Sequence, residues 1–185
     1  MVLPIYILGQ PVLRQVAEDV DLTDSTLPQF VQDMFDTLDR SGGIGLAAPQ
    51  VGRPLRVVVM DLNPIKEDYP QYEGYRRVFY NPYIEEYDKS QQESMDEGCL
   101  SLPGMSESVK RPTRIRVSYL DEQVQEHNEW VDGYLARVMQ HEFDHLDGKV
   151  YTDHIVGLRK QMLKGKLNDI IKGRFSCDYK VKVKK

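Results

Sequence analysis

Two histidines four residues apart, inside a run of helical periodicity, constrain this chain more than any other feature. Apolar residues recur at helical spacing through 134–146, between two glycines that would open and close the helix. His141 and His145 therefore lie on one face, one turn apart, where both imidazoles can bind a single metal ion. Glu142 follows the first histidine and can reach a metal-bound water without binding the metal itself. The segment predicts a central helix that carries a metal site.

The rest of the chain alternates strand and helix patterns around this segment. The predicted elements are, in order, a helix at 27–38, a buried strand at 55–60, short strands at 78–80 and 84–87, a β-hairpin joining 114–120 to 126–131, the helix at 133–148, a third helix at 153–172 and an alternating strand at 175–183. Residues 43–52 are too rich in Gly and Pro for a regular element, and 61–76 predicts a long ordered loop. We expect an α+β fold, with antiparallel β-sheets packed around the central helix, a C-terminal helix and a terminal strand.

Size and charge narrow the class of protein further. The 185 residues, 41% of them hydrophobic, are enough for one domain, 1–185, that needs no disulfide staples. This composition excludes a disulfide miniprotein, a collagen-like fibre and a mainly disordered chain. The 24 basic and 29 acidic residues give a net charge of −5, which disfavours DNA as a partner. No run approaches the length of a membrane span and the start lacks a signal-peptide pattern, so we expect a cytoplasmic protein without membrane contact.

A catalytic metal site needs a third protein ligand and an open position. His154 follows the histidine pair at some distance and would begin the next helix. Cys99 is the better candidate, because neighbouring glycines and a proline could aim its thiolate. Taken alone, a single cysteine is more often a small buried apolar residue, and Cys177, on the apolar face of the tail pattern, is interpreted in that way.

Three segments then resemble, in the family's order, the signature motifs of peptide deformylases. They are Gly43–Gln50 (GIGLAAPQ), Glu97–Ser101 (EGCLS) and Gln140–His145 (QHEFDH). The resemblance implies a metal-dependent amide hydrolase that removes the N-formyl group from the initiator formylmethionine of nascent polypeptides and releases formate. An N-formylmethionyl peptide would thus be the substrate, which makes the ribosome a candidate partner. The basic run at 180–185 is more simply interpreted as a solubilising strand end.

The same resemblance assigns the metal chemistry to named residues. It implies one divalent metal ion bound by Cys99, His141 and His145. The family favours Fe²⁺ in the cell, with Zn²⁺, Ni²⁺ or Co²⁺ able to substitute, and the donor types alone do not separate iron from zinc. A metal-bound water would attack the formyl carbon, with Glu142 as general acid/base.

The groups around the substrate are also carried over from the family. Gln50 and the backbone N–H of Leu100 would polarise the formyl oxygen as negative charge develops on it. The backbone at Gly45 would align the peptide as an added strand. The substrate-binding positions that the resemblance implies are Gly43, Ile44, Gly45, Glu97 and Val138.

A weaker prediction concerns an ion pair between Glu97 and Arg111 that would orient the Cys99 loop; two solvated charges explain these residues about equally well. The chain also departs from the family pattern. It lacks the basic residue that many members carry soon after the cysteine, and 61–76 resembles an insertion relative to the shortest members. The terminal strand is similar to the form whose C-terminus joins a sheet. These departures concern specificity and subclass rather than the chemistry.

Two other classes of protein remain open at this point. A metallopeptidase with the same helix motif would take its third ligand downstream and would keep its metal when Cys99 is substituted, whereas a deformylase would lose it. A domain with a structural metal would need four protein ligands and would leave Glu142 without a role. Such a domain would release no formate from formyl-Met peptides.

Overall fold

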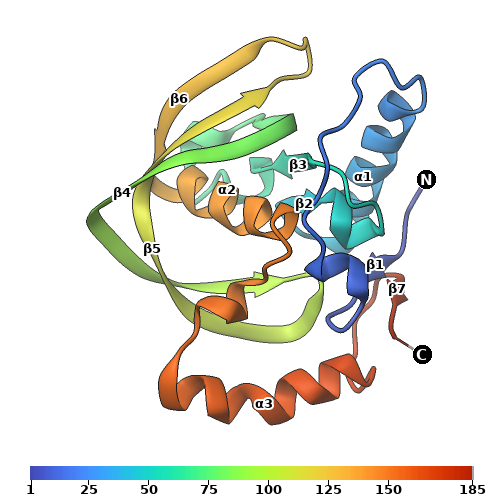
Figure 1. Ribbon diagram of the computed structural model, residues 1–185, viewed down its shortest axis with the longest axis vertical. Helices are drawn as coiled ribbons and strands as arrows, with labels where there is room; N and C mark the ends of the chain where they lie inside the picture. The colour runs from blue at the N-terminus through green and yellow to red at the C-terminus, as the bar shows by residue number, and fades with distance from the viewer. Residues whose placement is uncertain (185) are drawn as a thin grey trace.

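The computed structural model describes residues 1–184 and places two β-sheets and three α-helices in that part of the chain (Figure 1). The strands are β1 (Ile5–Tyr6), β2 (Gly45–Ala47), β3 (Val57–Asp61), β4 (Arg76–Cys99), β5 (Leu102–Leu120), β6 (Glu126–Asp132) and β7 (Val181–Lys182), and the helices are α1 (Leu27–Ser41), α2 (Gly133–Leu146) and α3 (Gly157–Ile171). Strands β2 to β6 form one antiparallel sheet in chain order, and β1 pairs in parallel with β7. The predicted α+β class is confirmed. None of these helices within residues 1–184 is long and apolar enough to cross a membrane.

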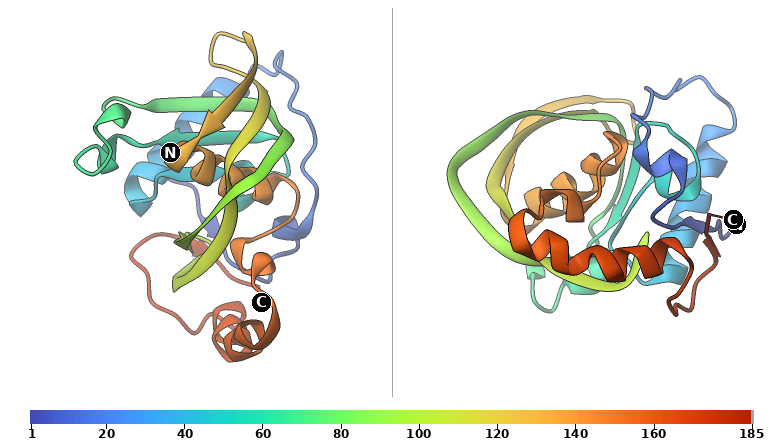
Figure 2. Two further views of the ribbon diagram at one scale, coloured as in Figure 1. Left: turned by 90° about the vertical axis from the view of Figure 1, so that its left-hand side faces the viewer. Right: turned by 60° about the horizontal axis from the view of Figure 1, so that its bottom comes forward.

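The helix with the two histidines, α2, lies inside the curve of the large sheet. β4 and β5 bend around it, so that it is enclosed on more than one side (Figures 1 and 2). Its apolar residues Ala136, Met139, Phe143 and Leu146 are at most 2% exposed. Phe143 meets the ring of Phe79 edge to face, with the centroids 6.2 Å apart. Enclosure by the sheet therefore fixes the position of α2.

Strand β3 separates two parts of the core. Successive side chains of a strand point to opposite faces, and here both faces are covered. Val57 and Val59 pack into the core shared with α1, while Val58 and Met60 pack into the core shared with α2, and all four are fully buried. Because β2 pairs with this rigid strand, the segment that begins at Gly45 is held beside α2.

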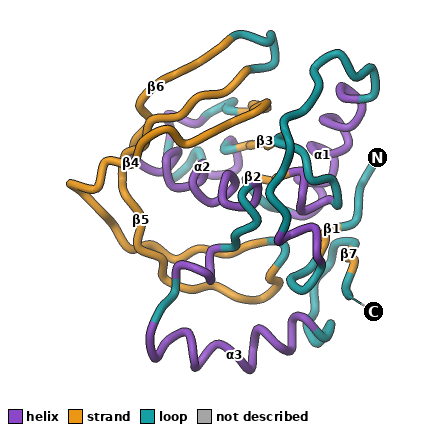
Figure 3. Tube along the Cα trace, in the orientation of Figure 1, coloured by secondary structure: helices purple, strands orange, loops and turns teal. Residues whose placement is uncertain are grey.

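The strands in the middle of the chain are longer than the sequence predicts. The expected strands 78–80 and 84–87 are parts of one strand, β4, and β5 begins well before the predicted start at residue 114. A bulge between Tyr80 and Tyr83 accommodates Asn81, at φ 49°, and the following proline, so the strand continues through them. The hairpin of β5 and β6 is confirmed, and 61–76 is a loop with two short 3₁₀ turns (Figure 3).

Two C-terminal predictions are wrong in extent. Asp153 does not begin α3: it lies in the 3₁₀ helix Tyr151–His154, where its carboxylate accepts a 2.8 Å bond from the Val150 N–H, and α3 starts only at Gly157. The predicted strand 175–183 shortens to the two residues of β7, because its partner β1 is itself only two residues long. Lys185, the last residue of the basic run, lies outside the described residues.

Candidate metal centre

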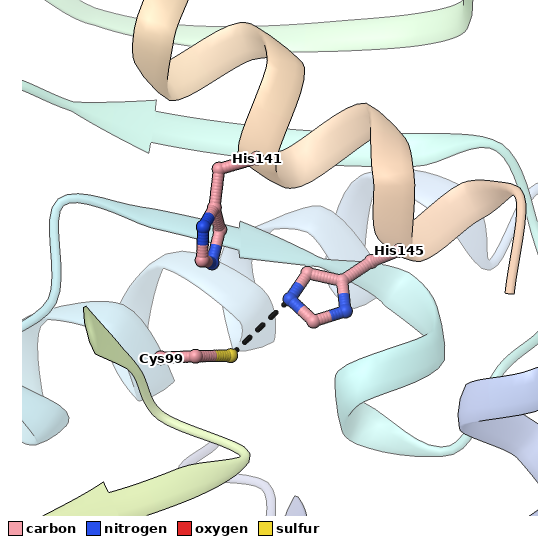
Figure 4. Close-up of side chains that lie close together, drawn as sticks. All are labelled: Cys99, His141 and His145. Atoms are coloured by element: carbon pink, nitrogen blue, oxygen red, sulfur yellow. Dashed lines mark hydrogen bonds between the residues drawn. The ribbon is translucent and has the colours of Figure 1, made fainter. Parts of the chain in front are cut away.

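The three predicted metal ligands lie together. His141 and His145 project from one face of α2, and Cys99 faces them from the end of β4 (Figure 4). The Cys99 Sγ lies 3.3 Å from His145 Nε2, and the ligand atoms of all three residues lie within 4.8 Å of one another. Cys99 and His145, 46 positions apart in the chain, meet because strand β4, which ends in Cys99, bends around α2.

The chemistry of this group fits a divalent metal ion. His141 Nδ1 lies 2.9 Å from Glu97 Oε2, an arrangement that leaves Nε2 free to bind a metal and fixes the ring. Burial would raise the pKa of the Cys99 thiol, but the charges and hydrogen bonds of His145 and His141 outweigh it and lower the pKa to about 5. A thiolate and two imidazoles, with no fourth such group among residues 1–184, match a catalytic rather than a structural site.

Behind His141, buried charges surround Glu97. Arg111 forms a bidentate pair with this carboxylate, at 2.7 and 3.0 Å, and Arg137 donates to it at 2.8 Å. Burial would raise the pKa of Glu97, but hydrogen bonds from His141 and Arg111 hold it well below its usual range. The predicted Glu97–Arg111 pair is therefore present and buried, not solvated. Arg111 also reaches Asp144 on α2 at 2.7 Å, so it joins both sides of the centre.

His154 takes no part as a ligand. Its Nε2 lies 2.7 Å from Asp144 Oδ2, at the outer end of the buried charge network. Neither Asp144 nor Arg137 was predicted from the sequence as a site residue. Arg137 had a signal, because it lies one helical turn before His141 on the same face.

A cavity of about 550 Å³ opens beside the three ligands. It is lined by all but one of the predicted site residues: Gly43, Ile44, Gly45, Gln50, Glu97, Cys99, Leu100, Val138, His141 and Glu142. The exception, His145, is fully buried next to the Cys99 thiol. Tyr134, Arg137 and Tyr179 also line the cavity and were not predicted to do so. All three signature segments thus contribute to one cavity.

Glu142 is buried at the edge of this cavity. Its Oε2 has no hydrogen-bond partner among the described residues, and burial raises the pKa of the carboxyl group. A methyl group on Gly45 would overlap the Glu142 carboxylate, so this position requires glycine for close approach. An unpartnered buried carboxylate is costly unless something else bonds to it, which marks Glu142 as a group held ready for substrate or water.

Gln50 is oriented by its own loop. Its Oε1 accepts a 2.8 Å bond from the Ala47 N–H, which turns the amide nitrogen toward Cys99. Gln50 Nε2 lies 3.3 Å from Ser101 Oγ and 3.5 Å from Cys99 Sγ. The side chain is almost fully buried, so it is an oriented donor in the cavity wall and not a surface amide.

Comparison with known proteins identifies the family of the chain. The family model described as polypeptide deformylase matches residues 2–161. The peptide deformylase of Cytophaga hutchinsonii is 40% identical over 182 residues, which cover 98% of this chain and 97% of that protein. A solved peptide deformylase from Plasmodium falciparum superposes with a TM-score of 0.80 at 36% identity, covering 91% of this chain and 95% of the other.

A second solved structure, peptide deformylase from Ehrlichia chaffeensis in complex with actinonin, has a TM-score of 0.80 at 34% identity and covers 95% of this chain and 99% of the other. The similarity in sequence and in structure therefore extends over nearly the whole length of each of these relatives. The chain belongs to the polypeptide deformylase family, the metal-dependent hydrolases that remove the N-formyl group from the initiator methionine of polypeptides.

Proposed function

We propose that residues 1–185 form a single catalytic domain in which the cavity beside Cys99, His141 and His145 is the deformylase active site. The observation that carries this proposal is the meeting of the three ligand atoms, within 4.8 Å of one another, at the edge of a cavity that all three signature segments line. The chain needs no further residue to complete a site with three ligands and an open side.

Cys99, His141 and His145 would hold the metal. A divalent ion bound there supplies a Lewis acid and lowers the pKa of a bound water, which makes hydroxide available at neutral pH. One thiolate and two imidazoles accommodate iron, zinc, nickel and cobalt. We assign Fe²⁺ as the ion in the cell, with Zn²⁺, Ni²⁺ or Co²⁺ as substitutes, because the family resemblance favours iron. Metal analysis of protein purified without oxygen tests the assignment.

Glu142 would move the proton. Its Oε2 faces no hydrogen-bond partner among the described residues, and burial raises the pKa of the carboxyl group toward the range in which it can both accept and donate a proton. The carboxylate would take a proton from the attacking water and deliver it to the departing amine of the methionine. This accounts for a buried acid that the fold leaves without an ion-pair partner.

Gln50 and Leu100 would stabilise the formyl oxygen. The Gln50 amide nitrogen is turned toward Cys99, and Leu100 is the next residue after that ligand. Two donors held at the cavity wall, one side-chain amide and one backbone N–H, can bond to the charge that develops on the oxygen during attack. Removing one such donor typically costs about 3 to 4 kcal/mol of transition-state stabilisation.

The remaining predicted positions would hold the peptide. Gly43 and Gly45 line the cavity at β2, an edge strand of the large sheet, where the substrate backbone would bond as an added strand. Ile44 and Val138 line the cavity and would contact the unbranched methionine side chain. Glu97 also lines it, but its carboxylate is occupied by basic side chains, so its role is to fix His141 and the loop around the metal.

Formate release from formyl-Met peptides, measured together with metal content, tests the function. Glu142→Ala is expected to keep its metal and to lose about 100- to 10,000-fold in kcat, because a general acid/base contributes that much. Cys99→Ala is expected to lose the metal. Glu129→Ala, which removes an exposed carboxylate on β6, is the matched control and should match the wild type. An active Glu142→Ala protein would overturn its role, and a wild-type protein that releases no formate would overturn the function.

The origin of the substrate favours the cytoplasm as the compartment and the ribosome as a partner. The basic residues of 180–185 are exposed or half-exposed where described, but the chain as a whole is acidic. Cosedimentation with ribosomes at physiological salt tests the second assignment, and loss of the protein from the ribosome pellet would argue against it.

A further inference from the structure

The C-terminal tail reaches the active-site cavity. Tyr179 lines the cavity, and its hydroxyl donates a 2.8 Å hydrogen bond to the carbonyl oxygen of Leu100. Leu100 directly follows the ligand Cys99. The family match ends at residue 161, so Tyr179 lies in a segment to which the family comparison assigns no role.

Backbone pairing holds this tail in place. The Ile5 N–H donates to the Lys180 carbonyl at 2.8 Å, and the Ile7 N–H donates to the Lys182 carbonyl at 3.0 Å, on either side of the β1–β7 pair. Arg40 at the end of α1 donates to the Asp178 carbonyl at 3.0 Å. The carbonyl oxygens of both neighbours of Tyr179 are therefore bonded, that of Lys180 by a backbone N–H and that of Asp178 by the Arg40 guanidinium. The short strands β1 and β7, one near each end of the chain, lie side by side (Figure 1).

The turn that Tyr179 contacts is not one of the favoured two-residue hairpin turns. Leu100 and Ser101 are the two residues that join β4 to β5, with Cys99 paired to Leu102. Favoured two-residue hairpin turns have at least one residue with positive φ, which matches the twist of the strands. Within residues 1–184 only Asn81 and Val124 are non-glycine residues with positive φ. The Leu100–Ser101 turn has no such residue, and hydrogen bonds from other segments hold it.

Those bonds come from three separate segments. The Leu8 N–H donates to the Ser101 carbonyl at 2.9 Å, and Gln50 Nε2 lies 3.3 Å from Ser101 Oγ. Tyr179 supplies the bond to the other carbonyl of the turn, that of Leu100. Ser101 is fully buried, so its groups need these partners. The N-terminal segment fixes one peptide unit of the turn, and the C-terminal tail fixes the other.

We propose that Tyr179 is a positioning residue for deformylation. Its hydroxyl holds the carbonyl of the Leu100–Ser101 peptide and thereby restricts the neighbouring Cys99–Leu100 peptide, whose N–H is then oriented for the formyl oxygen. This inference rests on the proposed function. The peptide planes on the two sides of the Leu100 Cα are linked by two soft dihedrals only, so a fixed carbonyl restricts the neighbouring N–H. The Leu100 N–H would bond to charge that develops only during attack. Loss of the Tyr179 hydrogen bond therefore affects kcat more than KM.

Tyr179→Phe tests this, since it removes the hydroxyl and keeps the ring. We expect kcat for a formyl-Met peptide to fall about fivefold to tenfold, the worth of one neutral hydrogen bond, with KM changed less than about twofold. Metal content and the visible absorption of the Co²⁺-loaded protein should equal those of the wild type. Tyr6→Phe is the matched control, because it removes a hydroxyl from β1 that contacts Lys182 and not the turn.

Three results would overturn the inference in an active protein. The first is a Tyr179→Phe protein with unchanged kcat and KM. The second is a raised KM at constant kcat, which would make Tyr179 a binding contact only. The third is an equal loss of kcat in Tyr6→Phe, which would mean that the tail acts through packing alone. A wild-type protein that releases no formate would instead remove the proposed function, and this inference with it. The two failures are therefore distinguishable.

Discussion

Helices α2 and α3 are almost equal in length and opposite in their relation to the fold. Ten of the 14 residues of α2 are buried, against two of the 15 in α3. Half of the buried α2 residues are polar or charged: Arg137, Gln140, Glu142, Asp144 and His145. On α3 only Leu163 and Ile170 are buried, and the helix lies at the edge of the molecule (Figure 2).

The difference shows two ways in which a helix is placed. α3 is attached by a few apolar contacts and by Arg159, which forms a bidentate pair with Glu107 on β5 at 2.7 and 2.8 Å. α2 is enclosed, and its polar residues would each cost free energy if they had no partner. The curved sheet supplies partners for three of them: Pro112 accepts from Gln140, Arg111 pairs with Asp144, and Glu97 pairs with Arg137. Among the described residues, Glu142 Oε2 and His145 Nδ1 have no such partner. The metal centre thus requires both the enclosure and the polar partners.

Truncating one apolar residue in each helix gives the largest expected contrast. Phe143→Ala should lower the free energy of unfolding by about 3 to 5 kcal/mol, because a fully buried ring leaves a cavity between α2 and the sheet. Leu163→Ala on α3 should cost less, about 2 to 3 kcal/mol, since a helix at the edge can shift to fill the space. Denaturant unfolding at one fixed excess of Zn²⁺ compares them. Equal losses would mean that α3 is as integral to the core as α2.

Breaking one ion pair beside each helix should give a smaller and more selective contrast. Arg111→Ala removes the cation shared by Glu97 and Asp144, so His141 is less firmly oriented. Metal affinity should fall about 10- to 100-fold, the usual effect of losing a group that orients a ligand. Arg159→Ala is the matched control on α3 and should leave metal affinity unchanged. Competition with a chromophoric chelator measures both, and an unchanged affinity in Arg111→Ala would contradict the orienting role.

The sequence was sufficient to predict the parts that local periodicity determines. The apolar spacing through 134–146 identifies α2, the His141–His145 pair predicts two metal ligands, and the three motifs identify the family. The strand 102–113 was missed for a physical reason. Every second residue from Met105 to Arg111 is buried, but two of these, Glu107 and Arg111, are charged. Their ion pairs come from other elements, so the alternation in burial does not appear as alternation in hydropathy.

Long-range contacts account for the other differences. Of the alternating positions in 175–183, Phe175, Tyr179, Val181 and Val183 pack on the core as expected, whereas the half-buried Cys177 is not among the residues packed there. A strand also needs a partner, and β1 offers two residues. The Tyr179 hydroxyl reaches Leu100 across 79 positions in the chain. No local pattern predicts a hydrogen bond of that kind. The proposed ligand Cys99 was predicted from its motif, whereas the buried partners Arg137 and Asp144 depend on the way the sheet wraps around α2.

Truncating the exposed apolar residues of α3 should have the smallest effect. Leu158 and Met162 are 72% and 65% exposed and lie one turn apart on this helix. Because so little of their apolar surface is buried, Leu158→Ala and Met162→Ala should each change the free energy of unfolding by less than about 0.5 kcal/mol, and kcat and metal affinity should stay at wild-type values. Denaturant unfolding and the formate assay check this. A loss of activity in either variant would mean that α3 affects the metal centre despite its exposed position. The two helices would then differ in burial but not in their effect on the metal centre.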